Sequence, residues 1–478
     1  MRWILAVGAV LVASTIAGPA SPRTVNINKR YVEEQNGINY NVFEHASTSS
    51  KMSFVKNSGI CETTSGVNQY SGYITVGEDM NMWFWFFEAR NNPQEAPLVA
   101  YFDGGPGTAS EYALFTQHGP CHFVNNETTP SLNPYSFNDY ANMLYVDQPI
   151  GAGFSYGNTT AVNSTKTAAP YVWILLQAFY DNFPEYENRD FGLWTESYGG
   201  HYGPEFVKYI LDQNTAISRG DLQGQEICVV ALGINNGWFD AKIQEKADID
   251  YAYDNPYRQI INESFHAELL SRYDTNCTPA LDQCAATDTS EDCFAAWNSY
   301  MQEIEYPILA AMKETATTVY PGDIREPTTR PPSTYVAYLQ RPDIQKALGA
   351  KVNYTDSLGA GDFIRDGDDP RSFMSELSTI VQAGIPVVSY AGDADYVCNW
   401  LGTLRVADEI QWPGQKRFAN QTLEPYTLDG MQKGTFKSLD NLIFMRIFEA
   451  GHNVPFYQPE VSLQIFEQTM KTGGVIPT

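Results

Sequence analysis

The chain has 478 residues, of which 43% are hydrophobic, and a formal net charge of −26 from 30 Lys and Arg against 56 Asp and Glu. This length and apolar content favour a folded protein with a large core and argue against a disordered chain. The acidic balance disfavours nucleic acid and anionic membranes as partners, because such a surface repels phosphate groups.

The N-terminal segment has the pattern of a secretory signal peptide. Arg2 precedes an apolar run from Trp3 to Ala13, which is too short to cross a bilayer, and small residues follow. We expect residues 1–20 to be removed, leaving 21–478 as the mature protein. No later run is apolar enough for a membrane helix. The expected location is therefore outside the cell or in a vacuole-like compartment.

The sequons and cysteines also indicate secretion. N-x-S/T sequons predict N-glycosylation at Asn126, Asn158, Asn163, Asn262, Asn276, Asn353 and Asn420. Seven cysteines in a secreted chain predict disulfides and at least one unpaired thiol. Cys277, Cys284 and Cys293 crowd one polar stretch and look like staples of a loop. The pairing stays open, and Cys61–Cys121 is one possibility.

Apolar runs that end in glycine-rich or acidic loops alternate with helical segments along the chain. Strands are expected within 96–105, 142–151, 190–196, 227–237 and 384–395, and helices within 168–186 and 198–214. This alternation predicts a mostly parallel α/β sheet with its site at the carboxyl ends of the strands. The polar stretch from about 240 to 335 does not follow this alternation of strands and helices. We interpret it as a cap inserted over the site of a single domain.

Two serines compete for the role of nucleophile in a strand–turn–helix elbow of the form G-x-S-x-G. Ser155, in "GFSYG", has the complete pattern, but its strand ends well before it and no helical pattern follows. Ser197, in "WTESYGGHY", has Thr195 in place of the first glycine, yet it lies between an expected strand and an expected helix. The elbow needs that context to hold the hydroxyl above the sheet. We therefore predict Ser197 as the nucleophile.

A serine nucleophile needs a base and an orienting acid, which in this type of sheet follow it in the order acid, then histidine. His452 lies in a loop after the last expected strand, where the base is needed. At an earlier strand end, "SYAGDADYVCNW" provides Asp393 and Asp395, and the pattern alone does not choose between them.

The other histidines have ordinary explanations. His118 and His122 are four residues apart, as in a metal-binding helix, but Gly119 and Pro120 between them argue against a helix. His201 lies on the elbow helix, where we expect it to pack away from the substrate. The sequence therefore predicts neither a metal site nor a cofactor.

A glycine-rich loop, "YFDGGPGTAS" at 101–110, follows an early strand. The developing negative charge of acyl transfer needs two preorganised N–H donors. One comes from the residue after the nucleophile, Tyr198, and the other from a loop of this kind. A phosphate-binding loop is the alternative, but the pattern G-x-x-x-x-G-K-[ST] is absent here.

Six stretches from about residue 60 to the C-terminus resemble, in this order, those of secreted serine carboxypeptidases, a family with the α/β-hydrolase fold. They are "GGPG", "DQPIGAGFSY", "ESYGGHYGP", "GINNGW", "GDADYVCNW" and "GHNVPF", and the wording is most similar to a fungal branch. The resemblance implies a triad of Ser197, His452 and Asp395, the last lying three residues before an unpaired Cys398. It also implies oxyanion N–H groups from Gly105 and Tyr198, and a pocket-shaping loop around Ser155.

The family recognises the free carboxylate of a peptide through an Asn, a Glu and the Glu before the nucleophile. Glu196 matches the last of these, whereas Asp103, beside Gly104, replaces the Asn and Gln117 replaces the other Glu. We infer that these two replacements compensate for each other, because together they still provide one amide group and one carboxyl group. We call this the compensated exchange. Asp103 and Glu196 cannot both ionise beside a substrate carboxylate at little cost, so we expect activity at acidic pH.

The predicted function is hydrolysis of C-terminal residues from peptides with a free C-terminus, through an acyl-enzyme. Acyl transfer or ester hydrolysis by the same triad is the first alternative. A silent cleft-binding protein is the second, and the intact order of Ser197, Asp395 and His452 argues against it.

Overall fold

The computed structural model describes residues 28–44, 50–124, 127–316 and 318–478. The predicted signal peptide, residues 1–20, and the sequon at Asn126 lie outside this part. Within it, no helix has both the length and the apolar character needed to cross a membrane.

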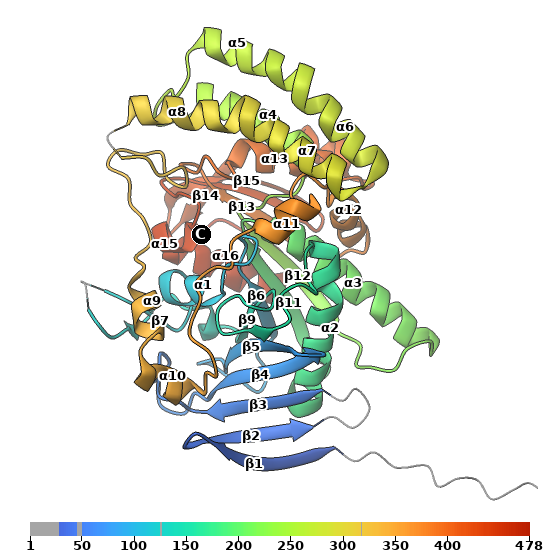
Figure 1. The fold of residues 1–478 in the computed structure, drawn as a ribbon. Helices are drawn as coiled ribbons and strands as arrows, with labels where there is room; N and C mark the ends of the chain where they lie inside the picture. Colours follow the sequence, from blue (N-terminus) through green and yellow to red (C-terminus); the bar gives the residue numbers. More distant parts are fainter. Residues whose placement is uncertain (1–27, 45–49, 125–126, 317) are drawn as a thin grey trace, which may run out of the picture.

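One large sheet runs through the molecule (Figure 1). Its strands are β1 (Lys29–Gln35), β2 (Ile38–Glu44), β3 (Lys51–Lys56), β4 (Gln69–Gly77), β5 (Met80–Phe87), β6 (Leu98–Phe102), β9 (Asn142–Asp147), β10 (Tyr156–Gly157), β11 (Asp190–Glu196), β12 (Cys228–Asn235), β13 (Val387–Gly392), β14 (Glu424–Leu428), β15 (Met431–Leu439) and β16 (Leu442–Ile447). Their order is β1-β2-β3-β4-β5-β9-β6-β11-β12-β13-β16-β15-β14, and β10 pairs with β5. A separate pair joins β7 (Cys121–His122) to β8 (Ser131–Leu132).

The centre of the sheet is parallel, as the sequence predicts. β9, β6, β11, β12, β13 and β16 pair in parallel. Every residue of β6, β9 and β13 is buried, which explains their continuous apolar runs. Antiparallel strands extend this centre on both sides, β1 to β5 on one and β15 with β14 on the other. The whole sheet is therefore mixed, because antiparallel strands that were not expected from the sequence flank its parallel centre.

Helices cover both faces of the sheet (Figure 1). They are α1 (Glu111–Thr116), α2 (Thr165–Asn182), α3 (Gly199–Arg219), α9 (Thr334–Leu339), α10 (Pro342–Leu348), α11 (Gly361–Asp366), α12 (Met374–Gln382), α13 (Trp400–Glu409), α14 (Gln415–Ala419), α15 (Val454–Tyr457) and α16 (Pro459–Thr472). The side chains of β6 alternate between two cores. Leu98 and Ala100 join the core under α2 and α3, and Val99 and Tyr101 join the one under α16.

A group of helices lies over the carboxyl edge of the central strands (Figure 1). It comprises α4 (Ala241–Tyr253), α5 (Glu263–Arg272), α6 (Thr278–Thr287), α7 (Ser290–Tyr300) and α8 (Tyr306–Thr315), with π-helical turns at Tyr273–Cys277 and Met301–Glu305. We call residues 241–315 the helical cap. A disulfide between Cys284 and Cys293 joins α6 to α7, while Cys277 remains a buried free thiol. Only two of the three crowded cysteines therefore form a staple.

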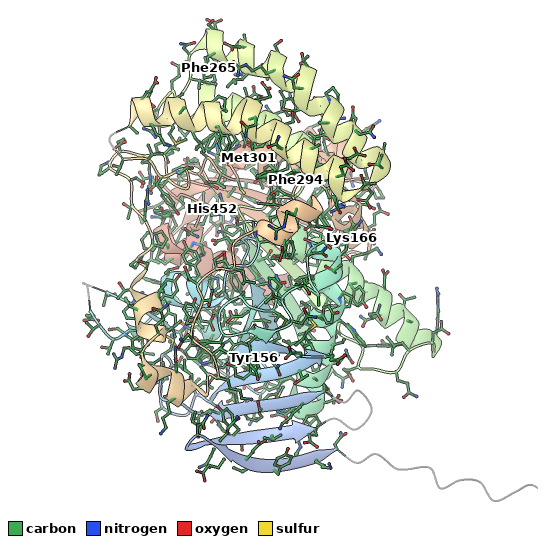
Figure 2. All side chains as sticks on the ribbon, in the orientation of Figure 1. Tyr156, Lys166, Phe265, Phe294, Met301 and His452 are labelled. Atoms are coloured by element: carbon green, nitrogen blue, oxygen red, sulfur yellow. A yellow bond between two sulfur atoms is a disulfide. The ribbon has the colours of Figure 1, made fainter. Side chains whose placement is uncertain are left out.

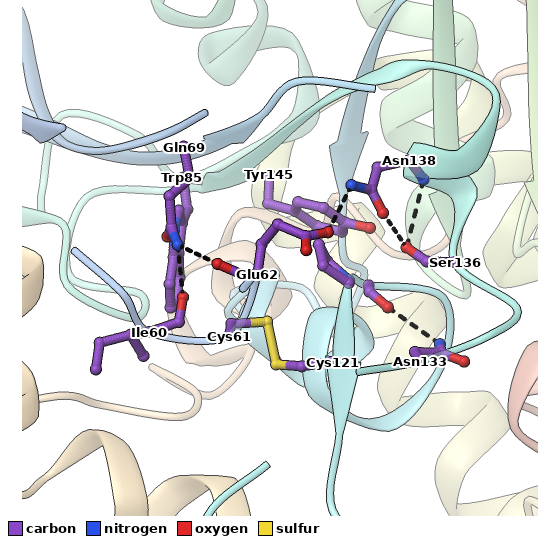
Figure 3. Close-up of a disulfide and its surroundings, with 12 residues drawn as sticks. Ile60, Cys61, Glu62, Gln69, Trp85, Cys121, Asn133, Ser136, Asn138 and Tyr145 are labelled. Carbon is purple, nitrogen blue, oxygen red and sulfur yellow. Dashed lines mark hydrogen bonds between the residues drawn. A yellow bond between two sulfur atoms is a disulfide. The ribbon is translucent and has the colours of Figure 1, made fainter. Parts of the chain in front are cut away.

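The second disulfide, Cys61–Cys121, confirms the pairing considered from the sequence (Figure 3). Beside it, the buried Glu62 accepts hydrogen bonds from Asn138 and from Arg90 Nε, at 3.0 and 2.8 Å. Asn133 Nδ2 donates to the carbonyl oxygen of Gln117 at 3.0 Å. This cluster anchors the segment that carries Gln117 toward the carboxyl edge of the sheet.

Candidate active site

Ser197 occupies a sharp turn between β11 and α3. Its backbone has φ of 61°, a conformation that is strained for any residue other than glycine. The turn is held on both sides, because Ser197 N donates to Asn235 O at 3.0 Å and Trp238 N donates to Ser197 O at 2.8 Å. A strained serine at a strand-to-helix turn is the geometry of a nucleophile elbow.

Thr195 fits in the elbow because the helix after it begins with glycine. A Cβ atom on Gly199 would lie 2.3 Å from Thr195 Cβ, far inside van der Waals contact. The Thr195 hydroxyl donates to Gly199 O at 3.0 Å, so this side chain also forms part of the turn. The bulk missing from position 199 therefore compensates for the bulk added at position 195.

His452 and Asp395 lie together at the carboxyl edge of β13 and β16. His452 Nδ1 is 2.8 Å from Asp395 Oδ2. A carboxylate accepts only, so the proton lies on Nδ1 and Nε2 is the basic nitrogen. Asp395 is fully buried and also accepts from Asn236 Nδ2 at 2.7 Å and from the Cys398 N–H at 3.0 Å. These bonds fix the carboxylate in the orientation that holds the imidazole.

Asp393, the other acid considered from the sequence, has a different role. Its carboxylate pairs with Arg446 at 3.1 Å and accepts from the hydroxyl of Tyr257 at 2.5 Å. The structure thus brings Asp395, and not Asp393, to His452.

The loop after β6 approaches the elbow closely at two glycines. A Cβ on Gly104 would lie 2.4 Å from Glu196 O and 2.6 Å from Tyr198 N. Gly105 has φ of 108°, which favours glycine. Among the hydrogen bonds of the described chain, none uses the backbone N–H of Gly105 or Tyr198. These two residues and Ser197 line the same cavity, where two unused donors can meet a developing oxyanion.

Glu196 is buried and accepts hydrogen bonds from three amides. Gln117 Nε2 donates to its Oε1 at 3.1 Å, Asn453 Nδ2 donates to the same oxygen, and Asn235 Nδ2 donates to Oε2 at 2.7 Å. Burial raises the pKa of Glu196 to about 7. The amide of Gln117 therefore does bond to a carboxyl, as the idea of a compensated exchange requires.

Asp103 lies beside this network and is also buried. It accepts from the Gly104 N–H at 2.9 Å and from the Tyr101 hydroxyl at 3.4 Å. Burial, followed by the negative charge of Glu196, raises the pKa of Asp103 well above its usual range. Two buried carboxyl groups that repel each other keep at least one proton in the site under acidic conditions.

The protonation of His452 depends on the same carboxyl groups. Burial lowers its pKa, but the charge of Asp395, followed by those of Glu196 and Asp103, raises it to about 9. When Glu196 and Asp103 hold protons their charges disappear, so the pKa of His452 falls. A neutral His452 and a protonated Glu196 thus favour each other.

Three asparagines of the site were not predicted from the sequence. Asn235 and Asn236 lie in "GINNGW", at the end of β12, and Asn453 follows His452. Asn235 Nδ2 reaches both Glu196 and the carbonyl of His452, the latter at 2.9 Å. All three lie in stretches that carry the family resemblance, but nothing in those stretches distinguished the asparagines from ordinary turn residues.

The remaining predicted residues lie as follows. Ser155 is buried in a loop, where its hydroxyl donates to Asp147 O and accepts from Trp83 N, both at 2.7 Å. His201 lies in the first turn of α3, where its ring is buried and its two nitrogens are within hydrogen-bond distance of the carbonyl oxygens of Trp238 and Asp369, at 2.5 and 3.1 Å. Cys398 is an unpaired, buried thiol that contacts the Ser197 side chain.

The described sequons lie mostly on the surface, as glycosylation needs. Asn163 is half-buried, and the exposed ones are Asn158, Asn262, Asn276, Asn353 and Asn420.

Comparison with known proteins agrees with this geometry. The family model for serine carboxypeptidases matches residues 59–472. Carboxypeptidase S1 of Penicillium janthinellum is 56% identical over 429 residues, covering 89% of this chain and 100% of that protein. Carboxypeptidase Y of Schizosaccharomyces pombe is 34% identical over 474 residues, covering 94% of this chain and 46% of that protein.

A solved structure shows the same fold. The prohormone-processing carboxypeptidase Kex1(delta)p from Saccharomyces cerevisiae superposes with a TM-score of 0.71 at 22% identity, covering 86% of this chain and 92% of that one. The α/β-hydrolase fold expected from the sequence is therefore confirmed. With the family match extending over most of its length, the chain belongs to the serine carboxypeptidase family.

Proposed function

We propose that this serine-type carboxypeptidase releases the C-terminal residue of peptides at acidic pH, with Ser197, His452 and Asp395 as its catalytic triad. The observation that carries the proposal is the buried Glu196, which three amides hold directly before the strained Ser197. An exopeptidase needs such a group beside its nucleophile, because it must sense the free carboxylate of the substrate.

The proposed chemistry assigns one role to each residue of the triad. The Ser197 hydroxyl attacks the last peptide carbonyl while His452 Nε2 takes its proton, and Asp395 stabilises the resulting imidazolium. The N–H groups of Gly105 and Tyr198 receive the oxyanion. His452 then protonates the leaving amine, and the C-terminal amino acid departs. A water molecule hydrolyses the acyl-enzyme by the same steps in reverse.

Recognition of the substrate carboxylate falls to Asp103, Gly104, Gln117 and Glu196. A protonated Glu196 can donate a hydrogen bond to the substrate carboxylate, whereas an ionised one repels it. Since the pKa of Glu196 is raised to about 7, the donor form is present at acidic pH and is lost as the pH rises through that value. Activity should therefore decline above about pH 7.

A pair of substrates that differ only at the C-terminus tests the proposal. An N-blocked dipeptide and its C-terminal amide should be compared at pH 5 with the wild type and with Ser197→Ala. We expect release of the last residue from the free acid, much slower cleavage of the amide, and no cleavage by the variant. Equal rates on both substrates would show that the free carboxylate is not recognised. Failure to release the last residue from either substrate would support an esterase or acyl transferase, and full activity of Ser197→Ala would exclude the triad.

The remaining parts of the proposal concern the whole chain. We propose one catalytic domain over residues 21–478, with the helical cap as an insertion that closes the site. We also propose that the protein is secreted after removal of residues 1–20 and that its sequons carry glycans. The partners are peptides, without nucleic acid, membrane or cofactor.

A further inference from the structure

A short turn carries His452, the base of the proposed triad. Residues 448–451 form this turn, which follows the end of β16, and we call them the base turn. Figure 2 shows His452 below the helical cap. Within the base turn, Glu449 has φ of 56°, a left-handed conformation that a glutamate keeps only where its surroundings hold it. The contacts of Glu449 therefore bear on the position of His452.

Asp393 holds the N–H side of Glu449. Its buried carboxylate accepts from Glu449 N at 2.9 Å through Oδ1. Backbone bonds join the same two loops, because Asp393 N donates to Ile447 O at 2.9 Å. In the same way, Ala394 N donates to Ala450 O at 2.8 Å. The acid that the proposed triad does not use is therefore part of the support of the base turn.

Arg325 holds the carbonyl side of Glu449. Its Nη1 donates to Glu449 O at 2.6 Å. The buried Asp323 fixes the guanidinium by a bidentate ion pair, in which Nε and Nη2 each lie 2.8 Å from a carboxylate oxygen. Next to this pair, Gly322 O accepts from His452 N at 2.7 Å. The segment that carries Arg325 therefore contacts both the base turn and His452 itself.

The other partners of Asp393 fix its own orientation. Its Oδ2 accepts from Arg446 Nη2 at 3.1 Å, and its Oδ1 also accepts from the Tyr257 hydroxyl at 2.5 Å. Tyr251, which like Tyr257 belongs to the helical cap, donates its hydroxyl to Asp393 O at 2.5 Å. The sheet and the cap thus both hold the residue that bonds to Glu449.

From this geometry we infer that Asp393 and Arg325 are positioning residues, which clamp Glu449 from its two sides and thereby present His452 to Asp395 and Ser197. Neither side chain is among the described residues that line the cavity at Ser197. The two residues therefore act through His452 and not on the substrate. The inference rests on the proposed function, because it concerns the base of that reaction.

Loss of the clamp should lower turnover more than it weakens binding. Proton transfer needs His452 Nε2 within hydrogen-bond reach of the Ser197 hydroxyl, and a displacement of about 1 Å can lower the rate about 100-fold. Of the amides that hold Glu196, those of Gln117 and Asn235 come from other segments of the chain. Recognition of the substrate carboxylate should therefore change less than the position of the base.

The test measures kcat and KM of the wild type, Asp393→Ala and Asp393→Asn on one N-blocked dipeptide at pH 5. Titration of Ser197 to completion with a phosphonate probe counts the folded sites, so that kcat is expressed per titrated site. Asp393→Ala removes the acceptor of Glu449 N and should lower this kcat by about 10- to 100-fold, with KM changed less than about threefold. Asp393→Asn keeps an oxygen for Glu449 N and should stay within about threefold of the wild type.

A variant that only folded poorly would lose titrated sites and keep its kcat per site. Arg325→Ala removes the donor to Glu449 O, so it should lower kcat per site as Asp393→Ala does, and it is the second test should that variant fail to fold. Asp408→Ala is the matched control, because Asp408 pairs with the buried Lys437 and forms no hydrogen bond with the base turn in the described chain. It should leave kcat per site unchanged.

Four results would overturn the inference or its basis. An unchanged kcat per titrated site in folded Asp393→Ala or Arg325→Ala would overturn the inference alone. So would a loss of kcat/KM that came from KM alone, or an Asp393→Asn variant as slow as Asp393→Ala. A wild type that released no C-terminal residue would overturn the proposed function and the inference with it.

Discussion

Replacing Glu196 by Gln should remove the alkaline decline of the pH profile and also weaken the enzyme. In the wild type, Glu196 loses its proton as the pH rises through about 7, and kcat/KM for a free peptide should fall with it. A glutamine cannot ionise, so the profile of the variant should stay level over this range. The charge of Glu196 also raises the pKa of His452, so the acidic limb of the profile should move to lower pH.

The size of the loss follows from the hydrogen bonds of Glu196. Both carboxyl oxygens accept from amide donors, so the NH₂ group of a glutamine must face at least one donor. If it replaces Oε1, both Gln117 and Asn453 must turn. If it replaces Oε2, Asn235 must turn and give up its bond to His452 O. One lost bond of this kind costs about 1–3 kcal/mol, or roughly 5- to 150-fold in kcat/KM.

The assay is kcat/KM for one N-blocked dipeptide from pH 4 to pH 9, for the wild type, Glu196→Gln and Glu226→Gln. Glu226 is an exposed glutamate whose variant should reproduce the wild-type profile. If Glu196→Gln kept an alkaline limb with the wild-type midpoint, another group would control that limb. That result would refute the assignment of the alkaline decline to Glu196.

Three further predictions concern the triad, its neighbours and stability. Asp395→Asn should lower kcat by roughly 10⁴-fold with KM little changed, because His452 would lose the acceptor that fixes its tautomer; steady-state kinetics would reveal a smaller role if the loss were under tenfold. Asp103→Asn should preserve or increase carboxypeptidase activity, since it removes a like charge beside Glu196; complete inactivation in the same assay would refute the compensated exchange. Replacing Cys61 and Cys121 by Ser should lower the free energy of unfolding by about 2–5 kcal/mol, and an unchanged denaturant midpoint would show that the bridge is dispensable.

The central strands could be predicted because their signals are local, and the proposed triad rests on signals of the same kind. Ser197 was identified by the strand before it and the helix after it, and His452 by its position after the last strand. The sequence pattern alone did not decide between Asp393 and Asp395, since both follow β13. That choice depends on which carboxylate reaches the His452 imidazole, which is a property of the folded sheet.

Other parts of the structure had no local signal. The helices of the cap carry mostly polar sequences, so their apolar faces are visible only once they pack together. Asn235 ends β12 and Asn453 caps α15, and short polar residues are common at both kinds of position. Their partner Glu196 lies 39 and 257 residues away in the sequence. No spacing rule within one chain can detect such contacts.

The single amide group of Asn235 links two parts of the site, and this link has a consequence for the kinetics. Its Nδ2 donates both to the carboxyl of Glu196 and to the backbone of His452. In the proposed mechanism, recognition of the substrate carboxylate and placement of the base therefore both depend on the side chain of Asn235. A substrate that binds poorly against Glu196 should also disturb the position of His452. Discrimination against peptides without a free C-terminus should therefore appear in kcat as well as in binding affinity. A measurement of affinity alone would then underestimate the selectivity of the enzyme.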